Sequence, residues 1–164
     1  MTIPWLPYLV LLESFGGDWT RYIEEVYSHF KRDFVDSKPS FRGVRMGLKR
    51  MPMEQGKEAT FWHMISEGKN EADRLPDLRR CERIRWPKPL VERVPCDEVR
   101  VWPEMRRGEN RIAIATSDFS YILILAERQG KNGIYHLPWT AYHVKHEHDR
   151  RHYEKEWQKN GVKG

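Results

Sequence analysis

The sequence predicts an α+β fold in which N-terminal helices pack on an antiparallel sheet of roughly four strands, with a further helix at the C-terminus. Three patterns predict this class: an aromatic stripe at helical spacing near the N-terminus, β-rich runs separated by turn residues, and a charged final segment with two aromatics on one helical face. A chain of 164 residues suffices for one hydrophobic core and is short for two. We therefore expect a single domain over 1–164, with an N-terminal helical extension and strand over 1–57, a core over 58–153 and a charged tail over 154–164.

The composition is that of a globular protein with a well-solvated surface. Aromatic residues make up 12% of the chain and include seven Trp, which supply large burial units, while 32% of the residues are charged. The net charge of +5 and the pI near 9.2 favour an anionic partner, because a positive field attracts phosphates. Nucleic-acid-binding proteins share this charge excess with proteins that bind lipid surfaces, so charge alone does not choose between them.

The cysteines and the N-terminal segment indicate a cytoplasmic protein. Cys81 and Cys96 lie in neither a CxxC motif nor a zinc knuckle, which predicts reduced thiols and no disulfide framework. The apolar segment 3–12 lacks a basic n-region and a small-residue cleavage site, and it is shorter than the roughly 20 residues that span a bilayer. We therefore expect no membrane association.

The first predicted helix is amphipathic. Asp18 is placed to cap it. Its apolar residues recur three and four apart, at Trp19, Tyr22, Ile23, Val26, Tyr27, Phe30 and Phe34. A stripe of this kind is usually core, so we expect this helix to pack and not to catalyse.

Shorter elements follow the first helix. Alternating apolar and basic residues over 44–49 predict a half-buried strand, and 58–66 predicts a short helix. A polar loop is expected over 68–77. The prolines after Trp86 and Lys88 predict extended backbone at those two residues, because a residue before proline avoids the helical region.

The second half predicts an antiparallel meander followed by a helix. Its β-rich runs are 98–102, 111–116, 121–126 and 134–144, and turn residues separate them. From Lys145 onward, Tyr153 and Trp157 share one helical face, so the last helix should lean on the sheet.

An arginine-dense segment is the first candidate for function. Arg79, Arg80, Arg83 and Arg85 offer guanidiniums that hold phosphate oxygens, and Trp86 offers a surface on which an unpaired base can stack. We take Arg79, Arg80 and Trp86 as RNA-binding candidates, and add Arg111 from the second strand run. The alternative is a solvated helix face whose arginines pair with Asp77 and Glu82.

A histidine and two hydroxyl residues complete a possible phosphate-handling set. His63 lies in the run Phe61-Trp62-His63, where small environmental shifts place imidazole titration near neutral pH; a satisfied core histidine is the alternative. Thr140 and Tyr142 lie two apart, so a strand would put both hydroxyls on one face; β-propensity alone also explains them. Metal-independent phosphate chemistry requires fixed cations, a proton-transfer group and a hydroxyl donor close together.

Other catalytic motifs are missing from the sequence. There is no P-loop, GxGxxG or GxSxG motif. His148 and His152 stand at i and i+4, but the zincin glutamate is missing, so we expect no bound metal and no cofactor. The four tail histidines, His143, His146, His148 and His152, fit a solvated or RNA-facing surface.

The order of these parts resembles the barnase–EndoU–colicin–RelE superfamily of small metal-independent ribonucleases, particularly its phage and prophage branches. The resemblance covers residues 58 to 153. It matches His63 to an early histidine, Arg83 or Arg85 to an intervening basic residue, and the segment Thr140-Ala141-Tyr142 to a late strand bearing a hydroxyl. It leaves the second acid/base residue open between His136, His143 and neither.

The resemblance implies a metal-independent endoribonuclease. In the implied reaction the ribose 2′-hydroxyl attacks the adjacent phosphate and leaves a cyclic phosphate; His63 moves a proton, Arg83 and Arg85 neutralise charge, and Thr140 or Tyr142 donates a hydrogen bond. It also implies a toxin-like role with an antitoxin or immunity protein as partner. The competing functions are a non-catalytic RNA- or protein-binding module of phage origin and a phage structural or DNA-packaging accessory.

Overall fold

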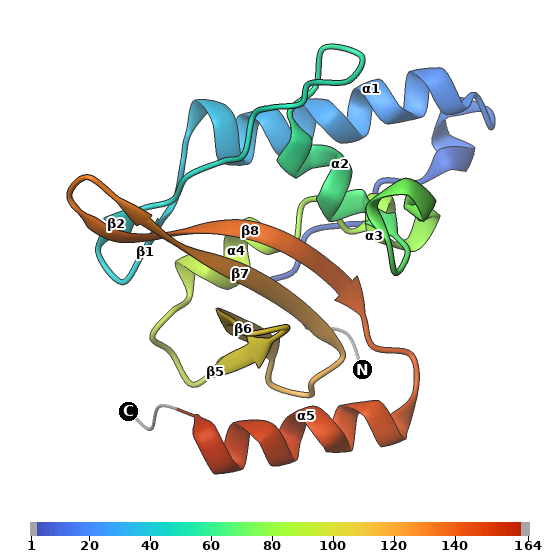
Figure 1. The fold of residues 1–164 in the computed structure, drawn as a ribbon. Helices are drawn as coiled ribbons and strands as arrows, with labels where there is room; N and C mark the ends of the chain where they lie inside the picture. Colours follow the sequence, from blue (N-terminus) through green and yellow to red (C-terminus); the bar gives the residue numbers. More distant parts are fainter. Residues whose placement is uncertain (1–2, 162–164) are drawn as a thin grey trace.

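A four-stranded antiparallel sheet forms the centre of the fold, with four helices on one face and the C-terminal helix on the other (Figure 1). The computed structural model describes residues 3–161, except for the side chain of Glu71. The predicted α+β class is confirmed. The strand order is that of a meander, β5-β6-β7-β8. The strands are β5 (Val99–Arg106), β6 (Glu109–Thr116), β7 (Tyr121–Gly130) and β8 (Gly133–His143).

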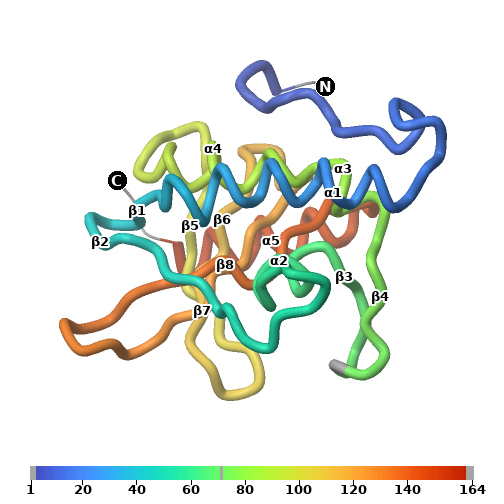
Figure 2. The backbone as a smooth tube through the Cα atoms, turned by 90° about the horizontal axis from the view of Figure 1, so that it is seen from above, coloured from blue at the N-terminus to red at the C-terminus, as the bar shows by residue number. Residues whose placement is uncertain are grey.

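The helices are short except for the first and the last. They are α1 (Trp19–Phe30), α2 (Ala59–Ile65), α3 (Leu78–Glu82), α4 (Pro87–Glu92) and α5 (Glu147–Asn160). Two 3₁₀ turns (Leu12–Phe15 and Glu71–Asp73) and a π-helical turn that extends α1 (Lys31–Asp36) accompany them. Two small ribbons pair β1 (Ser40–Phe41) with β2 (Val44–Arg45) and β3 (Ser66–Glu67) with β4 (Leu75–Pro76). Figure 2 shows α1 running over the helical layer, with β1 and β2 near one end and β3 and β4 near the other.

The predicted first helix is confirmed. The Asp18 side chain accepts a hydrogen bond from the Arg21 backbone N–H at 3.2 Å, which satisfies one of the free donors at the start of α1. Four apolar stripe residues within α1 are buried: Tyr22, Ile23, Val26 and Phe30. Trp19, in contrast, stays 40% exposed. The stripe therefore packs α1 into the hydrophobic core under the helical layer but leaves one tryptophan at the surface.

Each face of the sheet has its own hydrophobic core. Alternate residues along β6 and β7 point to opposite faces, so Leu123 packs under the N-terminal helices and Ile122 packs toward α5. On the α5 side, the ring of Tyr153 lies 6.2 Å from that of Trp102, and the ring of Trp157 lies 6.0 Å from that of Phe119. The predicted packing of the last helix on the sheet is confirmed.

Two features of the sheet position the site. The β5–β6 turn consists of Arg107 and Gly108, both with positive φ (53° and 75°), as a two-residue hairpin with right-handed strand twist requires. In β8, Leu125 pairs with Pro138 whereas Ile124 pairs with Thr140, so Trp139 is the extra residue of a β-bulge. A bulge redirects the bulged residue away from the regular ladder.

The strand predicted over 44–49 is wrong beyond its first two residues. The chain reverses at Arg42–Gly43, and only β2 pairs with β1. Met46 is buried, but Val44 is exposed, and the segment then meets β8 through a bond from the Gly47 N–H to the His136 carbonyl at 2.9 Å. A Cβ on Gly47 would lie 2.7 Å from the Tyr135 ring, so close packing replaces regular pairing there.

The extended backbone predicted at Trp86 and Lys88 is also wrong. Trp86 has φ −82° and ψ −35°, and α4 begins at Pro87 and includes Lys88. Proline is tolerated in the first turn of a helix because the N–H groups of that turn have no partner within the helix. The helix that carries Arg79, α3, ends at Glu82, four residues before Trp86.

One of the boundaries expected along the chain falls inside a helix. The helix α5 runs without interruption across the division expected between 153 and 154. Residues 162–164 of the expected tail and 1–2 of the N-terminal extension lie outside the described residues. Within 3–161, no helix is both long and apolar enough to cross a membrane. Cys81 and Cys96 are both free thiols, the first buried and the second exposed.

Truncation of the first core should destabilise the fold strongly. Leu123 is fully buried, so we expect Leu123→Ala to lower the free energy of unfolding by roughly 2–5 kcal/mol through lost burial and a residual cavity. Urea unfolding followed by tryptophan fluorescence measures this loss. Leu75, which is 72% exposed, provides the control; Leu75→Ala should change stability by less than about 0.5 kcal/mol. Equal losses in the two variants would contradict the assigned core.

Candidate active site

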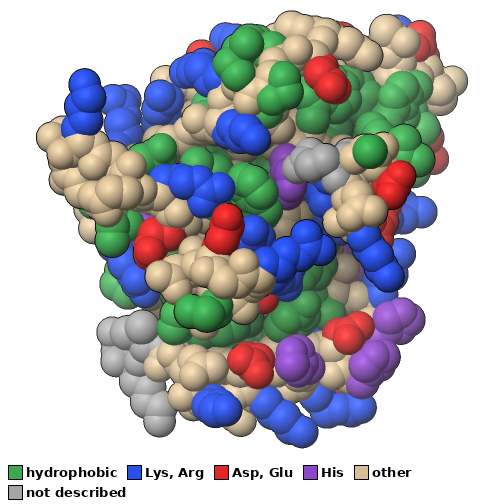
Figure 3. Space-filling model, viewed as in Figure 1, with side chains coloured by type: hydrophobic (Ala, Val, Ile, Leu, Met, Phe, Trp, Pro, Cys, Tyr) green, Lys and Arg blue, Asp and Glu red, His purple; other side chains and the backbone are tan. Residues whose placement is uncertain are grey.

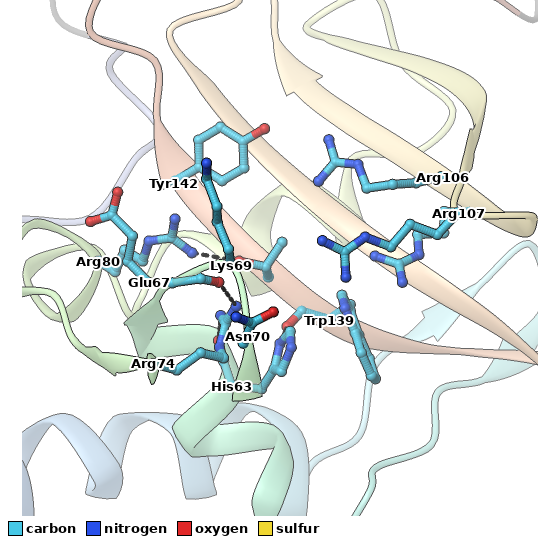
Figure 4. A pocket seen from close by; sticks show the side chains of 13 residues that line it. His63, Glu67, Lys69, Asn70, Arg74, Arg80, Arg106, Arg107, Trp139 and Tyr142 are labelled. Atoms are coloured by element: carbon cyan, nitrogen blue, oxygen red, sulfur yellow. Dashed lines mark hydrogen bonds between the residues drawn. The ribbon is translucent and has the colours of Figure 1, made fainter. Parts of the chain in front are cut away.

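A pocket of about 560 Å³ opens between the C-terminal end of α2, the segment after it, and the sheet at β8 and the β5–β6 hairpin. Its charged lining is strongly cationic. Among the described lining residues there are six cations and one carboxylate: Lys69, Arg74, Arg80, Arg106, Arg107, Arg111 and Glu67. Figure 4 shows Arg106 and Arg107 reaching into this space from one side and Arg80 from the other, with His63 and Trp139 at its base. We call it the cationic pocket.

His63 is held by the bulge of β8. Its Nδ1 lies 2.6 Å from the carbonyl oxygen of Trp139, a residue 76 positions away, and the two rings are 4.2 Å apart between centroids. A carbonyl oxygen only accepts hydrogen bonds, so Nδ1 carries the proton in this contact. The neutral ring therefore has its lone pair on Nε2, the nitrogen that can take up a proton. Because a bulged residue is left out of the regular ladder, its carbonyl is available to a side chain.

Arg80 links α3 to the late strand. Its Nη1 donates to Thr140 Oγ1 at 2.6 Å and to the Ser66 carbonyl at 3.1 Å. Its guanidinium carbon lies 5.2 Å from the centre of the Tyr142 ring, within range of a cation–π contact. Thr140 accepts from Arg80 and so retains its own hydroxyl proton for donation. The guanidinium and the hydroxyl thus meet in one place.

The sheet supplies three further arginines. Arg106 and Arg107 come from the β5–β6 hairpin, and Arg111 comes from β6. Arg111 is only 9% exposed; it pairs with Glu109 at 3.2 Å and lies 5.1 Å above the Trp139 ring. Burial works to lower the pKa of Arg106, but the Glu104 carboxylate at 2.8 Å and Tyr142 outweigh it and raise that pKa. The Arg106 guanidinium therefore stays charged at any physiological pH.

Arg74 supports the end of α2. Its Nη2 donates to the His63 carbonyl at 2.9 Å and to the Ser66 carbonyl at 2.5 Å, and Nη1 donates to the Gly68 carbonyl at 3.1 Å. The last carbonyls of a helix have no partner within it and carry partial negative charge. Arg74 therefore holds the backbone of His63 in place while contributing charge to the pocket.

The cationic pocket brings together five of the residues predicted from the sequence. They are His63, Arg80, Arg111, Thr140 and Tyr142, and they come from α2, α3, β6 and β8. Thr140 and Tyr142 do lie on one face, since their partners Ile124 and Ile122 both face α5. The Tyr142 hydroxyl is 2.7 Å from that of Tyr153, so it is tied to the last helix.

Four predicted residues do not line the cationic pocket: Arg79, Arg83, Arg85 and Trp86. Arg79 pairs with Glu82 at 2.8 Å, as the salt-bridged alternative expects. Arg83 lies on the same side of α3 as Arg79 and donates to the Arg79 carbonyl at 3.1 Å. Burial lowers the pKa of Arg83. Arg80 lies on the side that faces β8, which is why one guanidinium of this segment reaches the pocket and its neighbours do not.

Trp86 and Arg85 have other surroundings. The Trp86 indole N–H donates to the Pro7 carbonyl at 2.9 Å, and its ring stands edge-on to Tyr121 at 5.0 Å, so it closes the core against the N-terminal segment. Arg85 is partly buried near His29, whose pKa is lowered mainly by burial and then by the charges of Arg32 and Arg85. We therefore do not include these residues in the site.

Sequence reasoning missed Glu67, Lys69, Arg74, Arg106 and Arg107. The signal for Arg106 and Arg107 was present, because an Arg-Gly turn between two β-rich runs places those side chains at a sheet end. The other three lie in the segment expected to be a polar loop or next to it, where no periodicity predicts the direction of a side chain.

The remaining histidines lie elsewhere. His136 and His143 do not line the cationic pocket; burial is the first cause that lowers the pKa of each. In the tail, the rings of His146 and His148 are 5.6 Å apart. Among the described residues, no group of three or more His, Cys, Asp or Glu is arranged to hold a metal. Neither His136 nor His143, the two candidates for a second acid/base histidine, lies with His63 in the cationic pocket.

Thiolate chemistry is not supported. Burial, with the nearby Asp77 and Glu82 carboxylates, raises the pKa of Cys81 to about 12, so this thiol stays protonated at neutral pH. Neither Cys81 nor Cys96 lines the cationic pocket.

No family model, curated protein or solved structure matches the chain. The functional assignment therefore depends on the geometry of the cationic pocket.

The contact between His63 and Trp139 predicts an uncommon tautomer. We expect neutral His63 to be protonated on Nδ1, because that nitrogen donates to a carbonyl. Long-range ¹H–¹⁵N correlation spectra of the imidazole rings distinguish the two tautomers. Exposed His148 serves as the reference in the same spectra. Protonation of neutral His63 on Nε2 would contradict the contact.

Proposed function

We propose that this protein is a metal-independent endoribonuclease that cleaves RNA by attack of the ribose 2′-hydroxyl on the adjacent phosphate. The observation that carries the proposal is the shared pocket of His63, the guanidiniums of Arg80, Arg106, Arg107 and Arg111, and the Thr140 hydroxyl. In this reaction a P–O2′ bond forms and the P–O5′ bond breaks, leaving a 2′,3′-cyclic phosphate and a free 5′-hydroxyl. One group takes the 2′-hydroxyl proton, and another gives a proton to the leaving oxygen.

His63 fits one of these proton-transfer roles. The Trp139 carbonyl fixes its ring through Nδ1–H and directs the basic lone pair to Nε2. A base held in one orientation by a hydrogen bond to its other nitrogen is the arrangement that positioned imidazoles use in catalysis. The remaining proton-exchanging side chains in the pocket are Glu67, Lys69 and Tyr142, and the second role falls to one of them.

The arginines fit the electrostatic part of the reaction. A phosphorane carries more negative charge than the phosphodiester from which it forms, so cations fixed in advance stabilise the transition state more than the ground state. Arg80 is fixed by Thr140 and Ser66, and Arg111 by Glu109 and by the Trp139 ring. Thr140 can add a hydrogen bond to a non-bridging phosphate oxygen.

The biological setting is part of the proposal. The resemblance to the barnase–EndoU–colicin–RelE superfamily supports a cytoplasmic, toxin-like enzyme of phage or prophage origin that a partner protein neutralises. A non-catalytic RNA- or protein-binding module is the second candidate. One observation favours it. Arg74 and Arg80 already donate hydrogen bonds to backbone carbonyls, as arginines with a purely structural role would do.

Replacement of His63 should separate catalysis from binding. His63→Asn keeps an N–H that can reach the Trp139 carbonyl but cannot shuttle a proton, so we expect RNA cleavage to fall about 10²–10⁴-fold. Affinity for a 2′-deoxy oligonucleotide should stay nearly unchanged. The measurement is gel analysis of total RNA with purified protein in EDTA, with end-group analysis of the fragments.

The same assay identifies the competing functions. Cleavage that needs a divalent metal, or that proceeds on 2′-deoxy substrates, is incompatible with 2′-hydroxyl attack. A folded wild-type protein that binds RNA without cutting it is a binding module. Melting temperatures of wild type and His63→Asn show whether any loss of activity reflects loss of fold.

The hairpin arginine provides a charge test with a matched control. Arg107 and Arg42 both occupy the first position of two-residue turns, with φ of 53° and 52°, and both are exposed, but only Arg107 lines the cationic pocket. Asparagine tolerates this backbone region, so either change to Asn removes a charge without straining the turn. We expect Arg107→Asn to lower the slope of log affinity against log salt by about one, measured with a 2′-deoxy oligonucleotide. Arg42→Asn should leave the slope unchanged; equal slopes in both variants would place the phosphates elsewhere.

A further inference from the structure

A second hollow, of about 680 Å³, lies on the other side of His63, between α1, the segment 49–55 and α2. We call it the aromatic groove. It shares three lining residues with the cationic pocket, namely His63, Arg74 and Trp139, so the two hollows lie next to each other with these side chains between them. Figure 3 shows Lys and Arg side chains spread over one face of the molecule, some of them in the middle of that face beside hydrophobic side chains. A substrate that occupies both hollows would contact the residues that they share, His63 among them.

The aromatic groove differs in chemistry from the cationic pocket. Its lining mixes polar residues, including Glu24, Lys49 and Glu54, with apolar ones. The apolar part consists mainly of Trp19 and Trp62, Ile23, and the prolines Pro52, Pro76 and Pro138. The indole N–H of Trp62 donates to the Glu54 carbonyl at 3.0 Å, which fixes the orientation of that ring. Trp19 is 40% exposed although four other stripe residues of its helix, Tyr22, Ile23, Val26 and Phe30, are buried. Flat aromatic surface is thus available next to a site built for phosphate.

We propose that the aromatic groove binds an unpaired nucleobase of the RNA strand whose scissile phosphate occupies the cationic pocket, an inference that rests on the proposed function. Trp19 and Trp62 are the stacking residues. Stacking on tryptophan accepts any base, because every base has a π-face, so the groove selects single-stranded RNA and not a particular sequence. Bases inside a duplex are stacked on their neighbours and cannot enter it.

The adjacency of the two hollows argues for a base over other apolar occupants. In a nucleic acid strand the phosphate and the base belong to one repeating unit, so a phosphate held in the cationic pocket brings a base within reach of a neighbouring hollow. The two hollows offer this pairing, with Trp139 as the wall between them. Arg111 and Arg128 lie 5.1 and 5.3 Å from the Trp139 ring and His63 lies 4.2 Å from it, which leaves Trp19 and Trp62 as the stacking surfaces.

The test uses uncleavable probes, so that binding is measured apart from catalysis. A labelled single-stranded 2′-deoxy oligonucleotide is titrated by fluorescence anisotropy against an abasic oligomer and a duplex, each of matched phosphate number. We expect the base-containing single strand to bind about 5- to 100-fold more tightly than the abasic oligomer, the range for stacking of one base. Equal affinity for the two would overturn the inference.

Substitutions show whether Trp19 carries the preference for base-containing strands. Trp19→Ala should remove most of the preference for the base-containing strand, and Trp19→Phe should retain much of it, since phenylalanine keeps an aromatic face. Tyr8→Ala is the control, because Tyr8 is 90% exposed and lines neither hollow. If Trp19→Ala behaves like Tyr8→Ala, the groove is not the base site. Thermal melting confirms that each variant is folded.

The two proposals fail in different ways. If RNA is cleaved in EDTA but the abasic and base-containing strands bind equally, the groove inference is wrong and the nuclease stands. If binding depends on bases and on Trp19 but folded wild type cleaves no RNA, the nuclease is wrong, and the groove is the base site of a binding module.

Discussion

The candidate site depends on one long-range contact, the hydrogen bond from His63 to the Trp139 carbonyl. It joins the helical layer to the sheet across 76 positions of sequence. Among the described residues, β8 is an edge strand that pairs only with β7, and Trp139 is left out of the regular pairing by the bulge, so its carbonyl can accept from the helical layer. Once the contact is made, the ring has a fixed tautomer and a fixed position between a cationic and an aromatic hollow. The proposed chemistry requires both the fixed tautomer and the fixed position of the His63 ring.

The parts of the fold that the sequence predicts well are those with clear periodicity. The capped stripe of α1, the four-strand meander and the aromatic face of α5 each bury a repeating set of apolar residues, and each is confirmed. The failures are local and have backbone causes. Alternation over 44–49 predicts a strand only if a neighbour is free to pair, and the Arg42–Gly43 reversal limits that pairing to two residues. The prolines in α4 occupy the first turn, where they cost no hydrogen bond.

The candidate site is less predictable for a related reason. Sequence spacing placed Thr140 and Tyr142 on one face, because a strand has period two. It did not distinguish Arg80 from Arg79 and Arg83, because that choice depends on which side of the five-residue helix α3 meets β8. Nor does any local pattern predict a β-bulge or the partner of its carbonyl. Side chains brought together from α2, α3, β6 and β8 can be recognised as a set only once the fold is known.

The double use of Arg74 and Arg80 bears on how the site can be dissected. Both guanidiniums donate to the Ser66 carbonyl, so they neutralise the negative end of α2 as well as charging the pocket. Their removal would disturb the helix that carries His63, and a loss of activity in such variants would not distinguish a positioning role from a direct contact with phosphate. Arg107 makes the cleaner comparison, because it lies on an exposed turn with a matched arginine elsewhere. Arg74 and Arg80 both support the backbone around His63 and add positive charge to its pocket. The position of His63 and the charge of the pocket therefore cannot be changed separately at these two residues.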